Sequence, residues 1–178
     1  MDVHAATAGA PLLVGVDDSG GTMTFEELYR RDFTAVVGLV YALSGRRHVA
    51  EELAQEAFLA AHRAWHRIGV YDDPGAWVRR VAVNRAVSAL RRRSAEARTL
   101  LRLSGQRPLP DPLPDDAEAF WRAVRRLPTR QAQVIALHYL EDRSVKDIAA
   151  VLECAEATVR VHLHRGRQAL ATALGEDA

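Results

Sequence analysis

The spacing of apolar residues predicts helices along most of the chain. Apolar positions between Phe25 and Val40 recur at steps of three and four, with Thr24 placed to cap this first helix and Gly45 placed to end it. A second apolar stripe covers residues 49–68. A third helix is expected over Pro74–Arg93, because proline is tolerated in a first helical turn. Alternating β-branched runs are short, so the pattern predicts an all-α fold.

The second half of the sequence predicts four further helices. "DDAEAFWRAVRRL" and "PTRQAQVIALHYL" are followed by two shorter segments at about 145–152 and 156–170, with the spacing of a helix-turn-helix. Ser144 and Asp147 form an imperfect capping box, with aspartate where glutamate is usual. One side of the last helix is expected to be buried: Val159, Leu163, Gly166 and Leu170. The opposite side presents Ala157, Val161, His164 and Arg165, flanked by Thr158 and Arg160.

Proline placement divides the helical segments into two domains. Four of the seven prolines fall in "RPLPDPLPDD", and alternating proline favours an extended path over a helix. Residues 104–115 are therefore predicted to be a Pro-rich linker between a domain at 24–103 and a smaller domain at 116–175. Residues 1–23, which are rich in glycine and alanine, are predicted to be a flexible leader.

Composition indicates a globular protein without a membrane segment. The chain has 178 residues, of which 48% are hydrophobic and 26% charged, and "PLLVGV" is too short for a signal peptide or membrane helix. A single cysteine, Cys154, fits a reducing cytoplasm and gives no common zinc pattern. Net charge is +1, yet residues 79–107 hold nine arginines and one acid, a local excess of +8. Such a block is either a solvated face or a nucleic-acid contact.

The outward side of the last helix has the chemistry of a DNA-reading surface. A helix fits the major groove, where Arg160 and His164 offer donors to guanine or phosphate. Ala157 and Val161 are apolar on an exposed side, so thymine methyl groups would cover them; alternatively, Val161 packs against the linker or a partner protein. Phosphate contacts, which position the helix without specifying sequence, are expected from Arg165 and Arg167.

The third helix carries a second candidate nucleic-acid surface. Five residues on one side recur at steps of four and three: Trp77, Val81, Asn84, Ser88 and Arg91. Trp77 is equally well explained as a core residue. Asn84 and Arg91, which lead into Arg92 and Arg93, are harder to explain as core. Arginines beside an aromatic side chain suit single-stranded nucleic acid, because unpaired bases stack on aromatic rings.

Three segments together resemble the bacterial sigma factors of the extracytoplasmic-function (ECF) group. They are "AEELAQEAF" (50–58), "AWVRRVAVNRAVSALRRR" (76–93) and "LPTRQAQVIALHYLEDRSVKDIAAVLECAEATVRVHLHRGRQAL" (127–170). A helix-turn-helix alone would be weak evidence, whereas three segments in this order are specific. The resemblance covers roughly 24–93 and 116–170 and implies a transcription initiation factor without a cofactor.

The resemblance implies a division of labour between the domains. The first would match sigma region 2, which binds the β′ clamp helices of core RNA polymerase and captures the melted minus-10 element. The polymerase-binding positions would be Glu51, Glu52, Gln55 and Glu56. The minus-10 positions would be Trp77, Asn84, Arg91, Arg92 and Arg93. The second domain would match region 4, which meets the β flap and reads the minus-35 duplex through Ala157, Thr158, Arg160, Val161 and His164. An anti-sigma factor is an implied further partner.

Four positions depart from the family pattern. Glu153 stands where glycine is usual, so either this residue is strained or the turn has another shape. Ala155 replaces a serine cap, at a cost of about 1 kcal/mol to the helix. Val161 stands where serine is frequent, which predicts a different minus-35 preference. Ser88 stands where an acid is frequent, which leaves a minus-10 contact there in doubt.

The sequence disfavours two other classes of function. An enzyme is disfavoured because the chain has no Walker-type loop and no G-x-S-x-G elbow, and because His162 and His164, two apart on a helix, cannot share a metal. A free-standing helix-turn-helix regulator would need a sensor or dimerisation domain, and the first half shows neither a βαβ pattern nor a heptad seam.

Overall fold

The computed structural model describes the backbone of residues 23–101 and 115–175, and the side chains of residues 23–92 and 117–175. Within these ranges all the regular structure is helical, as the sequence predicts. The predicted leader, apart from Met23, and the predicted linker, apart from Asp115, lie outside the described residues.

Helix α1 (Phe25–Ser44) begins and ends as its sequence predicts. Thr24 and Glu27 form a capping box, in which Thr24 Oγ1 accepts from the Glu27 N–H and the Glu27 carboxylate accepts from the Thr24 N–H. Gly45 ends the helix at φ 67°, a left-handed conformation that glycine adopts at little cost. The buried side of α1 therefore starts from a defined register.

The second apolar stripe forms two helices, not the single helix expected over 49–68. Helix α2 (Arg47–Arg63) stops at Ala64, whose φ and ψ of −98° and 7° leave the helical range, and the short helix α3 (Trp65–Ile68) follows. The break turns Trp65 edge-on toward Phe25, with ring centroids 5.6 Å apart, and Ile68 is fully buried. Aromatic packing, which a helical periodicity does not encode, accompanies this change of direction.

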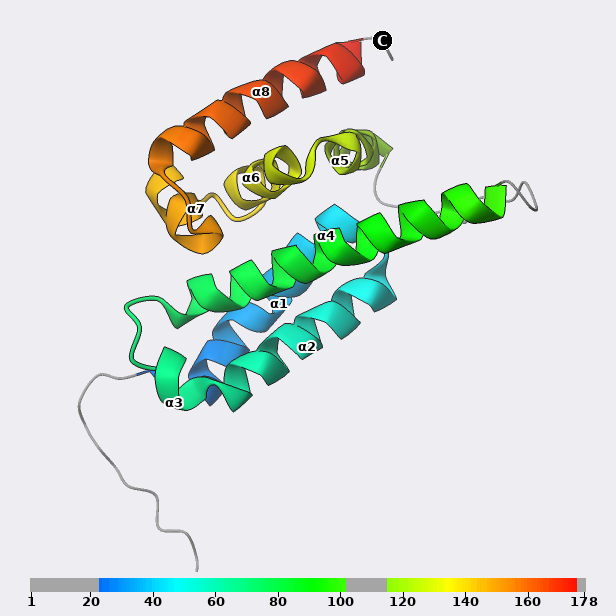
Figure 1. Ribbon diagram of the computed structural model, residues 1–178. Coiled ribbons are helices and arrows are strands. Elements are labelled where there is room, and N and C mark those ends of the chain that lie inside the picture. Colours follow the sequence, from blue (N-terminus) through cyan, green and yellow to red (C-terminus); the bar gives the residue numbers. More distant parts are fainter. Residues whose placement is uncertain (1–22, 102–114, 176–178) are drawn as a thin grey trace, which may run out of the picture.

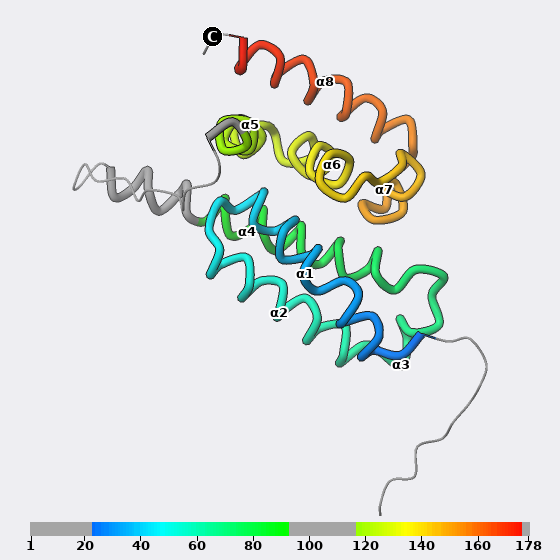
Figure 2. The backbone as a smooth tube through the Cα atoms, turned by 180° about the vertical axis from the view of Figure 1, so that it is seen from behind, coloured from blue at the N-terminus to red at the C-terminus, as the bar shows by residue number. Residues whose placement is uncertain are grey.

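Helix α4 (Pro74–Leu101) runs past Arg93, where the sequence analysis ended it. Alanine, leucine and arginine continue the helix, and the next glycine is Gly105. Figures 1 and 2 show α1, α2 and α4 lying alongside one another on one side of the molecule, with α5 to α8 on the other. Within the first group, α4 lies next to the second group of helices.

The second group contains α5 (Asp115–Arg126), α6 (Thr129–Tyr139), α7 (Val145–Leu152) and α8 (Glu156–Gly175). Helices α7 and α8 form the predicted helix-turn-helix, and both reciprocal hydrogen bonds of the Ser144–Asp147 capping box are present. The predicted buried side of α8 is confirmed, because Val159, Leu163, Gly166 and Leu170 are all buried. A Cβ at Gly166 would lie 2.9 Å from Ile135 Cγ1, so glycine allows α8 to approach α6 closely.

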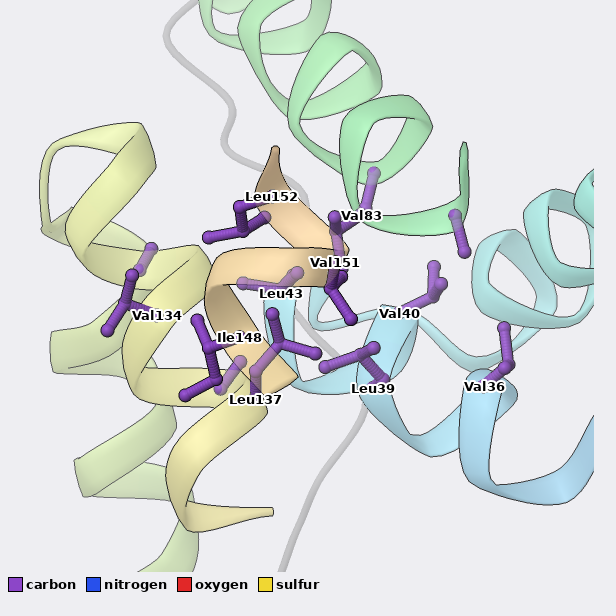
Figure 3. Packing of buried hydrophobic residues seen from close by; sticks show 14 of the residues in the cluster. Val36, Leu39, Val40, Leu43, Val83, Val134, Leu137, Ile148, Val151 and Leu152 are labelled. Atoms are coloured by element: carbon purple, nitrogen blue, oxygen red, sulfur yellow. The ribbon is translucent and has the colours of Figure 1, made fainter. Parts of the chain in front are cut away.

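The two groups of helices share one continuous hydrophobic core. Figure 3 shows α7 inserted between them, with Val151 directed toward Val83 of α4 and Ile148 beside Leu137 of α6 and the α1 residues Leu39 and Leu43. All six side chains are at most 2% exposed. The domains are therefore packed together, an arrangement that the sequence did not predict.

Candidate functional site

The outward side of α8 is held in place by the turn that precedes it. Glu153 ends α7 in the left-handed region, with φ 50° and ψ 55°, which is the strained alternative that the sequence analysis named. The Cys154 N–H donates to the Ala149 carbonyl at 3.1 Å and closes the turn. Ala155 has no side-chain oxygen with which to cap α8, so the orientation of this helix depends on packing of its buried side.

All of the predicted minus-35 residues are exposed on α8. The seven side chains open to solvent are Ala157, Thr158, Arg160, Val161, His164, Arg165 and Arg167. Val161 is 46% exposed and does not pack into the described part of the protein. Arg160 Nη2 lies 2.6 Å from Glu156 Oε2, one helical turn earlier, which orients its guanidinium along the surface. These residues lie together on the exposed side of α8.

Arg167 differs from the other predicted phosphate ligands. Its Nε donates to the Tyr139 hydroxyl at 2.8 Å, and its guanidinium carbon lies 5.6 Å from the centre of the Tyr139 ring. Its Nη2 also lies 3.0 Å from His138 Nε2. Arg167 therefore joins α8 to α6 while it remains exposed to solvent.

The candidate single-strand surface on α4 is divided between the core and solvent. Trp77 and Val81 are half-buried and pack against the hydrophobic core, which favours the core explanation of Trp77. Asn84, Ser88, Arg91 and Arg92 are exposed, and we call these four residues the α4 polar face. The side chain of Arg93 lies outside the described residues.

The α4 polar face is engaged by the second group of helices. Gln133 Nε2 donates to Asn84 Oδ1 at 3.3 Å, and Arg91 Nη2 donates to Thr129 Oγ1 at 3.0 Å. Arg80, on the same helix, forms an ion pair with Glu153 of the α7–α8 turn. Two residues expected to contact unpaired DNA therefore already have partners on α6.

Arg79, the first residue of the basic block, is neither a solvated charge nor a free nucleic-acid contact. Its side chain is 5% exposed, and its guanidinium binds two carboxylates, Asp32 Oδ2 at 3.0 Å and Glu141 Oε2 at 2.6 Å. The high positive charge of residues 79–107 suggested exposed arginines, and it therefore gave no indication that Arg79 forms buried ion pairs. A signal was available, because Arg79 follows Val78 on the apolar side of α4, and Asp32 lies midway between Leu28 and Val36 on α1.

Charge pairing lowers the pKa of Asp32. Burial alone would raise the pKa of this carboxyl, but hydrogen bonds from Arg31 at 2.9 Å and Arg79 at 3.0 Å, with their positive charges, lower it on balance. Gly75 allows this approach, since a Cβ there would lie 2.5 Å from Asp32 Oδ2. In the capping box, the Ser144 hydroxyl lowers the pKa of Asp147 by donating to its carboxylate at 2.6 Å.

The predicted polymerase-binding residues lie on one exposed side of α2. Glu52 and Gln55 are open to solvent, Glu51 is oriented by Arg47 at 3.2 Å, and Glu56 is held by Arg85 of α4 at 2.5 Å. Leu59, one turn further on, is 49% exposed and extends this surface. The sequence did not predict the exposure of Leu59, because an apolar residue beside a core stripe does not by itself indicate exposure.

Two exclusions hold within the described residues. Histidine, cysteine and acidic side chains there form no group suited to a metal ion. None of the helices in that part of the chain combines the length and apolar character needed to span a bilayer.

Comparison with known families matches both groups of helices. The family model "Sigma-70 region 2" matches residues 28–96, and "Sigma-70, region 4" matches residues 117–170. SigM, an ECF RNA polymerase sigma factor of Mycobacterium tuberculosis, is 30% identical over 165 residues, which cover 92% of this chain and 83% of SigM. SigW of Bacillus subtilis is 27% identical, over 74% of this chain and 79% of SigW. SigE of Mycolicibacterium smegmatis is 28% identical, over 91% of this chain and 66% of SigE.

Two solved structures share the fold. The sigma factor RpoE, crystallised with the anti-sigma factor NepR from Bartonella quintana, superposes with a TM-score of 0.69 at 23% identity, over 86% of this chain and 98% of that one. CnrH, in complex with the cytosolic domain of CnrY, superposes with a TM-score of 0.63 at 22% identity, over 86% of this chain and 89% of that one.

Proposed function

Because this chain belongs to the ECF sigma factors, which serve promoter-specific transcription initiation with RNA polymerase, we propose how its helices divide that task. Factors of this family regulate initiation and are not enzymes. In this proposal α8 reads the minus-35 element, α4 binds the melted minus-10 element, and α2 holds core polymerase. The work takes place in the cytoplasm, where these partners meet.

The outward side of α8 is the observation that carries the proposal. The opposite side of α8 packs in the core. Exposure of two short apolar residues, Ala157 and Val161, therefore does not contribute to the stability of the domain and is better explained by a binding partner. In the major groove these side chains would meet thymine methyl groups, while His164 and Arg160 donate to base edges or phosphates. Arg165 and Arg167 would contact the backbone and fix the register of the helix.

The α4 polar face would bind the displaced single strand. Asn84 offers both donor and acceptor groups to an unpaired base edge, and Arg91 and Arg92 follow the backbone, with Arg93 continuing the run. Trp77, half-buried, would leave only part of its ring for stacking. Melting requires no chemistry, because binding of an extruded base offsets the few kcal/mol that unpairing costs.

Two further partners are proposed for the two groups of helices. Glu51, Glu52, Gln55 and Glu56 would bind the β′ clamp helices, and the second group would meet the β flap. An anti-sigma factor would sequester the chain, a role for which the crystallised complex of RpoE with the anti-sigma factor NepR offers a parallel. Near-neutral net charge supports dependence on polymerase, since non-specific DNA affinity follows the number of phosphate contacts.

Transcription with purified core polymerase tests the proposal. The chain should direct run-off transcription from genomic fragments, and Arg91→Ala with Arg92→Ala should bind polymerase normally yet give weaker permanganate reactivity in the promoter bubble. Arg30→Ala with Arg126→Ala, which removes two exposed arginines outside α4, controls for net charge. Unchanged permanganate reactivity in the α4 variant would refute the role of this face, and binding to duplex DNA without polymerase would favour a free-standing regulator.

A further inference from the structure

Glu156 is an acidic residue on a surface whose other side chains suit DNA. It is the only acid in the sequence of α8, and it lies in the first turn of that helix, directly before Ala157 of the outward side. Its side chain is 44% exposed. A carboxylate in this position is repelled by phosphate and lowers the affinity of α8 for DNA of any sequence. A contribution of Glu156 to DNA recognition therefore concerns specificity and not overall affinity.

Stability of the helix accounts for only part of this placement. An acid in the first turn interacts favourably with the helix dipole, whichever residue stands at position 160. The ion pair between Glu156 and Arg160 adds little to stability, because the two side chains are 44% and 62% exposed and water screens their attraction. The pairing of these two residues is therefore better explained by what it does to Arg160.

The contact with Glu156 fixes the direction of the Arg160 side chain. Arg160 Nη2 lies 2.6 Å from Glu156 Oε2, as in a short charge-assisted hydrogen bond. Side chains of a helix lean toward its N-terminus, and this bond holds the guanidinium over the first turn of α8. The N-terminal residues of a recognition helix are the ones that contact base edges. A guanidinium has five N–H donors, so the bond to Glu156 leaves enough of them for a bidentate contact with guanine.

The other two arginines of α8 are held differently. Arg165 makes no hydrogen bond or ion pair with another residue that the structure describes, and Arg167 donates to the Tyr139 hydroxyl at 2.8 Å. Within the described part of the chain, Arg160 is thus the arginine of α8 that pairs with an acid. A carboxylate partner offsets positive charge and weakens the attraction to phosphate, whereas directed hydrogen bonds to a base edge remain possible. Arg165 is therefore suited to phosphate and Arg160 to a base edge.

We propose that Glu156 is a positioning residue for minus-35 recognition: it holds Arg160 toward a guanine of the duplex and away from the flanking phosphates. This role rests on the proposed reading of the minus-35 element by α8. Glu156 lowers the affinity for all sequences but enlarges the difference between the correct sequence and others. Without Glu156, Arg160 reaches a phosphate, where it strengthens binding to every sequence alike.

Holoenzyme assembled from core polymerase and the full chain provides the test. The duplex carries the minus-35 element of a promoter obtained from run-off transcription, and each base pair of that element is changed in turn. Fluorescence anisotropy over a salt series gives the affinity for each duplex. Glu156→Ala should reduce discrimination at one G·C base pair by about tenfold, which is within the range for one bidentate contact between arginine and guanine. It should also increase the slope of log affinity against log salt by about one, because Arg160 then binds a phosphate.

Arg160→Ala identifies the residue through which Glu156 acts. In the parent chain this change should abolish discrimination at the same G·C base pair and leave the salt slope as it is. In the Glu156→Ala background it should remove the added slope and cause no further loss of discrimination. The two changes are therefore expected to be non-additive, as they are for residues in direct contact.

Asp142→Asn is the matched control for charge. It removes one negative charge from an exposed side chain of the second group of helices, outside α8, and asparagine tolerates the positive φ of 50° at this position. Discrimination and salt slope should equal those of the parent chain. Glu156→Gln keeps a hydrogen-bond acceptor without the charge, and it should show a smaller loss of discrimination with the same rise in slope. This variant decides the question if circular dichroism shows that Glu156→Ala loses helix.

The outcomes separate this role from the proposed function. If the parent holoenzyme discriminates among the duplexes and the Glu156 variants discriminate equally well, the positioning role is refuted and the role of α8 stands. A uniform loss of affinity with unchanged discrimination would make Glu156 a structural residue of α8, and a loss confined to an A·T base pair would refute the contact with guanine. If the parent holoenzyme binds all the duplexes alike, the proposed role of α8 is refuted, and the role of Glu156 with it.

Discussion

The side-chain amide of Gln133 on α6 donates a hydrogen bond to Oδ1 of Asn84 on α4, with 3.3 Å between the two atoms. Gln133 is 1% exposed, so its polar group is buried and depends on such a partner. Asn84, which we propose to bind an unpaired base, is thus already bound within the chain. DNA that binds Asn84 must first replace this hydrogen bond.

The pKa of Asp32 predicts a loss of stability in acid. Because the folded state lowers this pKa below its ordinary value of 3.8, the ion pairs stabilise the fold fully above that value. The stabilisation declines as the pH falls below 3.8 and is lost as the pH falls through the pKa of Asp32 in the folded state. The free energy of unfolding in urea should therefore fall more steeply below about pH 4 for the parent chain than for Asp32→Asn. Parallel pH profiles would contradict this assignment.

Close approach of α8 to α6 predicts opposite effects of alanine at two helical glycines. Gly166→Ala places a methyl group 2.9 Å from Ile135 Cγ1 and should destabilise the protein by about 1–3 kcal/mol. Gly38→Ala in α1 meets no atom within 4 Å and should stabilise it by up to about 1 kcal/mol through helix propensity. Denaturant unfolding measures the change in stability of both variants. Equal changes would show that helix propensity alone, and not the contact with Ile135, determines the effect of alanine.

The left-handed conformation of Glu153 predicts that glycine is preferred there. Glu153→Gln keeps the strained backbone and removes the ion pair with Arg80, whereas Glu153→Gly removes both. Glu153→Gly should therefore be more stable than Glu153→Gln by about 1 kcal/mol, since a side chain in this region costs about that much. A glutamine variant equal to the glycine variant in thermal unfolding would mean that the turn is not strained.

Arg165 is predicted to contact phosphate without reading sequence. In complex with core polymerase, Arg165→Ala should weaken binding to all minus-35 sequences alike and reduce the slope of log affinity against log salt by about one. Fluorescence anisotropy on a panel of duplexes over a salt series measures both quantities. A change confined to one base pair would instead make Arg165 a sequence-reading residue.

Val161 is predicted to read sequence without contributing charge. Val161→Ser should weaken binding at one thymine-containing position by about 1–3 kcal/mol, because the apolar contact with a methyl group is lost. The salt dependence should stay the same, which distinguishes this variant from Arg165→Ala. Uniform weakening across the panel would place Val161 against a protein partner.

Leu59 is predicted to belong to the polymerase-binding surface of α2. It is 49% exposed beside Gln55 and Glu56, and Leu59→Asp should reduce affinity for core polymerase by about tenfold, the effect of burying an unpaired charge in an interface. Val70→Asp, at a site 76% exposed in the α3–α4 turn, is the control and should bind normally. Surface plasmon resonance without DNA measures both affinities.

The local features of the fold could be predicted from the sequence because neighbouring residues determine them. Thr24 and Glu27 cap α1, Gly45 ends it, and the Ser144–Asp147 box starts α7, each through contacts within a few residues. The inward and outward sides of α8 follow from a period of 3.6 residues. The family resemblance likewise depended on motifs that lie in continuous segments.

Only the tertiary structure decided how these helices meet. The break at Ala64 accompanies the packing of Trp65 on Phe25, and the burial of Arg79 requires carboxylates that lie 47 and 62 residues away along the chain. Periodicity locates a charged residue on a helix side but cannot state which distant charge it meets. For that reason a sequence that predicts two separate DNA-binding domains folds as two groups of helices with one core, in which α6 forms hydrogen bonds with Asn84 and Arg91 of the α4 polar face.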